Sequence, residues 1–180
     1  MEIEPRVLRK ARRGDPRAFA ALIRHYDEGL RALAYRLLGD RDRMDDALQE
    51  AYVRAFRALP AFRGDCSPGT WLYRIAYNAC LDELRRTRRV VPLESIRERS
   101  DPRPGADETV PARRLLADAL GTLAPEDRAT VLLVDAQGFD YRGAAEILGI
   151  PEGTVASRLN RARAVLRRCL DDRLQGASER

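Results

Sequence analysis

The sequence predicts an all-α protein of two small helical domains joined by a flexible linker, with a helix-turn-helix in the C-terminal domain. Leu, Ala, Arg and Glu dominate the chain, and apolar residues recur at three- and four-residue spacing over most of its length. Residues 91–111 break this pattern with four prolines and scattered charge, which is typical of a linker. After residue 140 a short helical pattern, a Gly-Ile-Pro turn and a longer helical pattern follow one another.

Residues 1–90 should form the N-terminal domain. The pair Asp15-Pro16 suits a helix cap followed by a first helical residue, and opens a helix that reaches toward Leu38. A second helix is expected from about residue 42 to residue 59, where Pro60 stops it. A third begins after the glycine-containing turn at 64–69 and continues to the arginines at 85–89.

Residues 112–175 should form the C-terminal domain. Helical spacing resumes at Ala112, and Pro125 with the two acids that follow it opens another helix, because a fixed φ and negative charge both suit a helix N-terminus. Gly138 is placed to end that helix. Asp140 can cap a short helix over 141–148, and Gly149-Ile150-Pro151 then turns the chain into a longer helix.

The longer helix has an apolar side and a polar side. At 100° per residue Val155, Leu159, Ala162 and Leu166 share one stripe, which we expect to be core. Small and polar residues lie opposite and on the flanks, where they can approach base edges and phosphates in a major groove. The predicted DNA-binding residues on this helix and at the start of the preceding short helix are Tyr141, Arg142, Thr154, Ala156, Ser157, Arg158, Asn160, Arg161 and Arg163.

The segment "DDALQEAYVRAF" also predicts a helix with two usable faces. A stripe that includes Met44, Leu48 and Ala55 should pack inward, while a second face mixes acidic, amide and apolar groups, which suits a partner helix. That second face comprises Asp46, Gln49, Glu50, Val53 and Phe56. A metal-binding enzyme, which could use Asp45, Asp46 and Glu50, is the alternative, but no second acidic or histidine cluster completes a coordination sphere.

The segment "FRGDCSPGTWLYRIAYNACLDELRRTRR" joins a short glycine-containing loop to a helix in which aromatic residues alternate with arginines. Aromatic rings stack on unpaired bases and arginines hold phosphates, so the segment suits single-stranded DNA, with the loop able to pocket an extruded base. Trp71 is expected in the core rather than at the DNA. The candidate contacts are Phe62, Arg63, Asp65, Cys66, Ser67, Arg74, Tyr77, Asn78 and Arg85.

Composition sets wider limits. Residues 1–90 carry 19 basic and 13 acidic side chains, and the remainder 14 and 15, so charge must be judged locally. No apolar run approaches the roughly 20 residues of a membrane-spanning helix, and the first residues lack the apolar core of a signal peptide, so a cytoplasmic protein without membrane insertion is expected. Three cysteines without a CxxC spacing predict neither a disulfide framework nor a zinc site. We expect no catalytic residue, metal or cofactor.

Taken together, four stretches resemble the extracytoplasmic-function (ECF) group of bacterial RNA polymerase sigma factors, and they cover nearly the whole chain. They are GDPRAFAALIRHY, DDALQEAYVRAF, FRGDCSPGTWLYRIAYNACLDELRR and LAPEDRATVLLVDAQGFDYRGAAEILGIPEGTVASRLNRARAVLR. The resemblance implies that Asp46, Gln49 and Glu50 dock on the coiled coil of the largest subunit of core RNA polymerase. It also implies that the loop from Phe62 to Thr70 captures a flipped base of the −10 element.

By the same resemblance the C-terminal domain reads the −35 promoter element, with Ala156, Ser157, Asn160 and Arg161 facing the bases. Members of the group are commonly held inactive by an anti-sigma factor, so such a partner is implied. The alternative is a stand-alone helix-turn-helix repressor or activator, which would need a symmetric dimer to read paired half-sites. No dimerisation helix is evident beyond Arg173.

Overall fold

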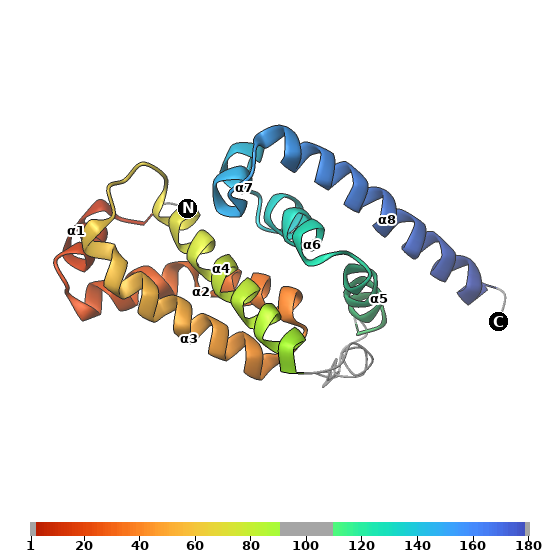
Figure 1. Ribbon diagram of the computed structural model, residues 1–180, viewed down its shortest axis with the longest axis horizontal. Helices are drawn as coiled ribbons and strands as arrows, with labels where there is room; N and C mark the ends of the chain where they lie inside the picture. Colours follow the sequence, from red (N-terminus) through yellow and green to blue (C-terminus); the bar gives the residue numbers. More distant parts are fainter. Residues whose placement is uncertain (1–2, 91–109, 179–180) are drawn as a thin grey trace. The chain divides into compact units, whose positions relative to one another are not determined.

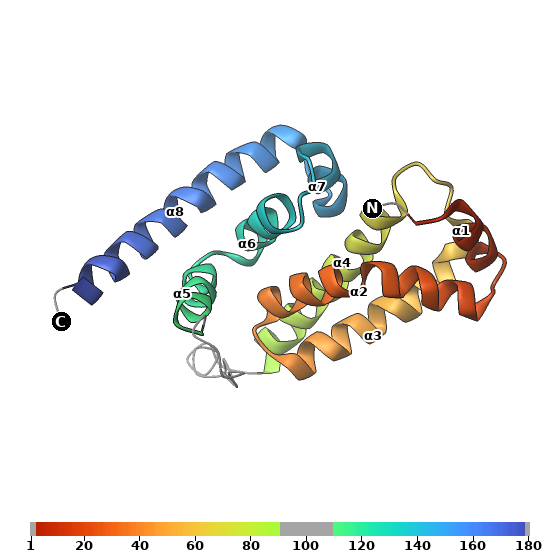
Figure 2. The same cartoon turned by 180° about the vertical axis from the view of Figure 1, so that it is seen from behind.

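The computed structural model describes residues 3–90 and 110–178, and every regular element within those two ranges is helical (Figures 1 and 2). The predicted all-α class is therefore confirmed. The chain divides near residue 100 into two compact units, here called unit 1 and unit 2. The predicted linker, residues 91–111, lies outside the described residues except at its last two positions.

Within residues 3–90, unit 1 contains four α-helices and one short 3₁₀ turn. They are α1 (Pro5–Arg12), α2 (Pro16–Leu38), α3 (Arg41–Ala58), η1 (Leu59–Ala61) and α4 (Pro68–Val90). The three predicted helices of this unit are confirmed, whereas α1 was not predicted. Asp15 caps α2 as expected, because its carboxylate accepts hydrogen bonds from the backbone N–H groups of Arg17 and Ala18 at 2.9 and 3.2 Å.

The core of unit 1 lies between α2, α3 and α4. The predicted inward stripe of α3 is buried, with Leu48 at 1% and Ala55 at 0% exposure. Cys80 of α4 is fully buried, and burial raises the pKa of its thiol to about 12. The nearby guanidinium of Arg43 donates to Glu83 at 3.3 Å, which ties α3 to α4 beside this thiol.

A second part of the same core joins α1 to the segment that precedes α4. Ala11 of α1 packs in one cluster with Phe62 and Trp71, and Val7 and Leu8 pack against it. The loop between η1 and α4 therefore packs against α1 as well as against α2 and α3. Figures 1 and 2 show α1 beside the base of this loop from both sides.

Over residues 110–178, unit 2 shows five helical segments. They are α5 (Val110–Gly121), α6 (Pro125–Val131), the π-helical η3 (Leu132–Ala136), α7 (Tyr141–Leu148) and α8 (Glu152–Ser178). The single helix predicted to run from Pro125 to Gly138 is therefore divided. In its second half the backbone widens, and the N–H of Gln137 donates to the carbonyl of Leu132 at 3.0 Å.

The predicted helix-turn-helix is confirmed as α7, a tight turn and α8. Asp140 caps α7 by accepting from the N–H of Gly143 at 2.7 Å, and a Cβ at Gly143 would lie 3.0 Å from that carboxylate. Gly149 ends α7 at φ +68°, in the left-handed region that favours glycine. The core stripe of α8 is confirmed, since Val155 and Leu159 are fully buried against α6 and α7.

Candidate functional site

The outer face of α8 carries the predicted duplex-reading residues. Ser157, Asn160 and Arg161 are exposed, while Ala156 is half-buried between them and the core stripe. The hydroxyl of Ser157 donates to the carbonyl of Thr154 at 3.1 Å, which fixes the direction of its lone pairs. The face is thus shallow along its centre, as close approach to base edges requires. The flanking Arg158 is half-buried and Arg163 is exposed.

Two arginines of this face are held by carboxylates from other helices. Arg161 donates through Nε and Nη2 to both oxygens of Asp127 on α6, at 3.1 and 2.8 Å. Arg163 makes the same two-bond pair with Asp135 on η3, with its Nε at 3.0 Å. These hydrogen bonds raise the pKa of both guanidinium groups. Partners 34 and 28 residues away leave no sequence signal, so neither pair could be predicted from the sequence.

The start of α7 supplies the remaining residues predicted for this face. Tyr141, the first residue of the helix, is exposed. Arg142 is also exposed, and its Nε contacts Glu146 one turn later at 3.4 Å, so the side chain lies along its own helix. Both are accessible to a DNA backbone that lies across the N-terminus of α7, where the helix dipole also favours negative charge.

The loop before α4 differs in part from its prediction. Phe62 was expected at the DNA but is 7% exposed, and its ring packs on Trp71 with centroids 5.2 Å apart. Ser67 is exposed, yet its Oγ accepts from the N–H of Thr70 at 3.0 Å and so caps α4. Arg63 and Asp65 are exposed at the tip, and Cys66 is half-buried against the core below.

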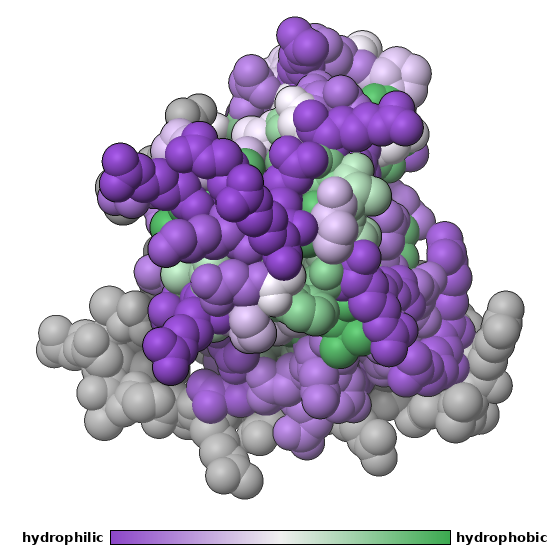
Figure 3. Space-filling model, turned by 90° about the vertical axis from the view of Figure 1, so that its left-hand side faces the viewer, coloured by the Kyte–Doolittle hydropathy of each residue, from purple (hydrophilic) through white to green (hydrophobic). Residues whose placement is uncertain are grey.

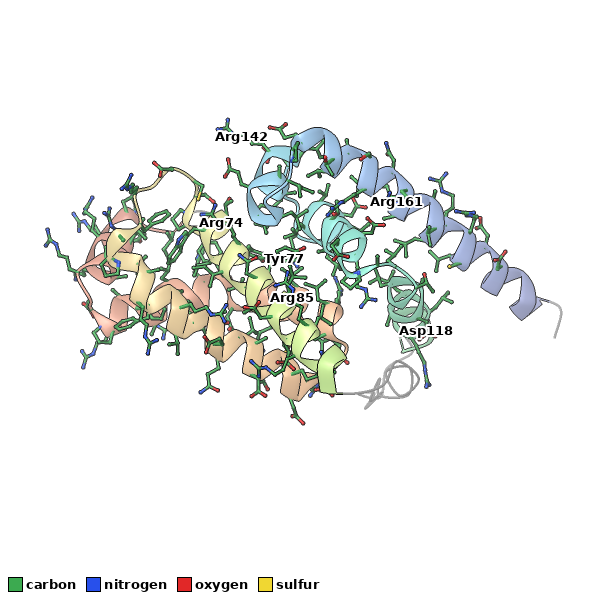
Figure 4. All side chains as sticks on the ribbon, viewed as in Figure 1. Arg74, Tyr77, Arg85, Asp118, Arg142 and Arg161 are labelled. Carbon is green, nitrogen blue, oxygen red and sulfur yellow. The ribbon has the colours of Figure 1, made fainter. Side chains whose placement is uncertain are left out.

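Along α4 the predicted DNA residues also separate into exposed and buried ones. Arg74, Asn78 and Arg85 are exposed and lie within about 40° of one another around the helix, using 100° per residue. Tyr77 is 3% exposed and belongs to the core. Figure 4 labels Arg74, Tyr77 and Arg85 along this helix. The buried rings of Tyr77 and Phe62 have no open face on which a base could stack, so both leave the candidate surface.

The predicted partner face of α3 is exposed at all five positions. Val53 and Phe56 are 40% and 42% exposed, which is unusual for large apolar side chains, and Phe56 meets Phe19 of α2 edge to face at 5.0 Å. Asp46 and Gln49 lie in the open, and Glu50 accepts from Arg54 at 2.9 Å. These five residues, Asp46, Gln49, Glu50, Val53 and Phe56, are called the α3 partner face below.

An ion-pair chain that was not predicted from the sequence links this face to α4. Arg54 donates to Glu50 on α3 and, at 2.8 Å, to Asp82 on α4. Asp82 in turn accepts from Arg85 at 3.3 Å. All four side chains are at least 42% exposed, so each pair contributes little stability, and Asp82 connects Arg85 to Arg54 of α3.

No group of three or more metal-ligating side chains gathers within residues 3–90 and 110–178. All three cysteines lie in those ranges and are thiols rather than disulfides. Among the described helices, none combines the length and apolar character that crossing a bilayer requires.

Comparison with protein families assigns both units. Residues 22–90 match the family model of sigma-70 region 2, and residues 113–166 match that of sigma-70 region 4. The first match covers α3, the loop and α4, and the second covers the helix-turn-helix. Residues 5–21, which include α1, lie outside both matches.

Individual proteins agree over most of the chain. ECF RNA polymerase sigma factor SigM of Mycobacterium tuberculosis is 42% identical over 161 residues, which span 87% of this chain and 79% of SigM. CnrH, solved in complex with the cytosolic domain of CnrY, is 31% identical with a TM-score of 0.70, over 92% of this chain and 96% of CnrH. The sigma factor RpoE of Bartonella quintana, solved with the anti-sigma factor NepR, is 26% identical with a TM-score of 0.68, over 85% and 96%. The chain therefore belongs to the ECF group of RNA polymerase sigma factors.

Proposed function

We propose that this sigma factor directs transcription initiation through three surfaces of its own, each formed by residues identified above. The α3 partner face would bind core RNA polymerase, on the coiled coil of its largest subunit. Its two exposed apolar side chains, Val53 and Phe56, can be buried as anchors, and the acids and amide around them supply a polar rim. The hydrogen bond from Arg54 already restricts the conformation of Glu50, so docking would cost little further side-chain entropy at this residue.

The second surface would hold the opened non-template strand at the −10 element. Arg63, Asp65 and Cys66 at the loop tip can line a pocket for one extruded base, while Arg74, Asn78 and Arg85 follow the strand along α4. Phe62 and Ser67 contribute indirectly, because one anchors the loop in the core and the other caps the helix. Unstacking a base costs a few kcal/mol, which the pocket and the cations offset.

The third surface would read the −35 element as intact duplex. Ala156, Ser157 and Asn160 can approach base edges, and Arg161 can donate its fork to a guanine. For that contact Arg161 must leave Asp127 or share it, so the carboxylate restrains the arginine until the correct base is present. Tyr141, Arg142, Thr154, Arg158 and Arg163 would hold phosphates on either side.

Separate weak contacts suffice when one assembly makes them together, because the second contact becomes intramolecular. In this scheme residues 1–90 and 112–175 act as separate domains, and the chain carries no catalytic chemistry of its own. It works in the cytoplasm, with the polymerase. An anti-sigma factor is a further expected partner, supported by the relative RpoE, which was solved with one.

The observation that carries this proposal is the exposure of the whole α3 partner face in a unit whose other α3 stripe is buried. A stand-alone repressor could use that face only as a dimer interface, and it would then act without polymerase. The test is run-off transcription from a pool of promoter sequences by core polymerase, with and without the chain. Sequence-dependent transcripts that require the chain support the proposal. A chain that shifts duplex promoters alone and adds no transcripts would point to the repressor instead.

A further inference from the structure

We propose that α1 carries a binding surface for nucleic-acid phosphates, which holds the backbone of the opened promoter strand beside the base in the loop. The proposal rests on the proposed function of that loop and extends it to a helix outside both family matches. The surface, called the α1 cation surface, consists of Arg6, Arg9, Lys10, Arg12, Arg13 and Arg17.

The α1 cation surface is exposed and has little opposing charge. All six side chains are exposed, and between residues 4 and 17 the only acids are Glu4 and Asp15, which leaves a net charge of +4. The carboxylate of Asp15 is already engaged in capping α2. Figure 3 views the molecule from the α1 end and shows hydrophilic side chains over most of that face. In Figure 4 nitrogen-tipped side chains project outward around α1.

No ion pair within the described residues involves the α1 cation surface, although ion pairs are common elsewhere in those residues. The helix turns its apolar residues Val7, Leu8 and Ala11 into the core, so its cations occupy the opposite side. These charges are therefore available to a ligand without first breaking a salt bridge.

The arrangement is unfavourable for the isolated helix. Arg6 lies three residues before Arg9 and four before Lys10, and like charges at these spacings repel one another along a helix. Arg6 also stands in the first turn, where the helix dipole favours acids over cations. The helix dipole favours cations only in the last turn of α1, so it does not account for Arg6. A bound polyanion would remove both penalties at once.

The position of α1 indicates which polyanion. Ala11 packs in the same buried cluster as Phe62 and Trp71, at the base of the loop, and Cys66 of the loop packs against that cluster. A strand that places one base in the loop must carry its phosphates past the neighbouring surface. Arg63 at the loop tip is also an exposed cation, so the α1 cation surface and the tip could share those flanking phosphates.

A lipid surface fits the same helix less well. Helices that bind membranes insert exposed apolar side chains beside their cations. The large apolar residues that are exposed among the described residues are Tyr35, Val53, Phe56, Leu116 and Tyr141, and none of them belongs to α1. The apolar face of α1 is already covered by its own unit.

The test compares two variants of the full chain that lose the same charge. Arg9→Gln with Arg13→Gln removes two neighbouring cations of the α1 cation surface. Arg36→Gln with Arg41→Gln removes two exposed arginines, one in the last turn of α2 and one at the start of α3. Each variant is assembled with core polymerase, and promoter binding is measured as a function of salt. When salt is raised from 50 to 200 mM, the wild type should lose promoter affinity by a factor about tenfold larger than the α1 variant does, because the variant lacks two phosphate contacts. The control should follow the wild type.

Neutral methylphosphonate linkages locate the contact. Replacing the two phosphates on either side of the captured base should weaken wild-type holoenzyme several-fold, while adding little further loss to the α1 variant. Equal additional losses in both proteins would overturn the proposal, as would an unchanged salt dependence. If the α1 variant bound core polymerase more weakly, α1 would belong to the polymerase interface and the proposal would be overturned. It would also be overturned if the variant lost binding to phosphatidylglycerol vesicles as strongly as it lost binding to the promoter. Wild-type transcription tests the proposed function separately, because it does not depend on these variants.

Discussion

The arginines of α8 and the cations of α1 differ in what surrounds their charged groups. Arg161 and Arg163 are each clamped by a carboxylate from a neighbouring helix, through two hydrogen bonds. The α1 cation surface has no such pair within the described part of the chain. Both regions face outward from small helical units, and both are rich in arginine.

This difference in carboxylate partners is the one expected between residues that recognise DNA bases and residues that bind the DNA backbone. A base-edge contact requires a guanidinium at a fixed place. A carboxylate that holds this guanidinium competes with the DNA, so only a base that binds the arginine strongly displaces it. Phosphates are everywhere along a strand, so the cations that hold them need only be present in number. We therefore expect changes in α8 to alter which promoters are used, and changes in α1 to weaken all of them alike.

The largest expected effect removes both regions from the promoter at once. Glu50→Arg should abolish binding to core polymerase, because it reverses a charge within the α3 partner face and turns Arg54 from a partner into a like-charged neighbour. Co-purification with core polymerase measures the loss, and circular dichroism should show unchanged helix content. Glu28→Arg, a reversal at an exposed position of α2, is the matched control. Normal co-purification of the Glu50 variant would remove the α3 partner face from the account.

A smaller effect should separate specificity from affinity. Arg161→Ala should relax preference at one position of the −35 element by about 5-fold to about 150-fold, as for the loss of a base-edge arginine. Sequencing the transcripts from a promoter pool measures the preference. Arg167→Ala, at an exposed position of the same helix, should leave it unchanged. A uniform loss over all sequences would mean that Arg161 contacts only phosphate.

The caps of α4 and α7 allow the two units to be compared in stability. Ser67→Ala and Asp140→Ala should each lower the free energy of unfolding by about 1 kcal/mol, because each exposes helix N–H groups that the cap now satisfies. Trp71 is the only tryptophan and belongs to unit 1, so its fluorescence should report the first change. Circular dichroism should report both. If Asp140→Ala shifted the fluorescence transition equally, the units would unfold together and not separately.

The smallest expected effect tests the restraint on Arg161 directly. Asp127→Asn weakens a pair that is largely exposed on the arginine side, so binding to non-promoter duplex by the holoenzyme should rise only about two- to fivefold. Discrimination between promoter and non-promoter DNA should fall by a similar factor. Glu126→Gln removes the same charge from the same helical turn and serves as control. Stronger discrimination in the Asp127 variant would contradict a restraining role.

Much of the architecture was predictable because the helical spacing of apolar residues continues over long stretches of this chain. The stripe through Leu48 and Ala55 and that through Val155 and Leu159 were assigned from spacing alone, and both are buried. Helix α1 was missed because four of its eight residues are cations, which leaves too few apolar residues for a helical pattern to stand out. The π-helical segment was missed because one extra residue in a turn leaves no compositional trace.

The candidate surfaces were predictable only in part. Spacing placed the α3 partner face outward correctly, since its positions alternate with a long core stripe. It misplaced Phe62 and Tyr77, because an aromatic residue beside arginines suits either a base or a core, and only packing decides between them. The pair between Arg161 and Asp127 depends on how α6 lies against α8, which no local pattern records.

Strand opening at the −10 element should require core polymerase and the chain together. Permanganate reacts with thymines that are unpaired, so a promoter selected from the pool can be probed with core polymerase alone, with the chain alone, and with both. Reactive thymines are expected within the −10 element only when polymerase and chain are present together. Reactivity with the chain alone, or no reactivity in any mixture, would contradict this expectation.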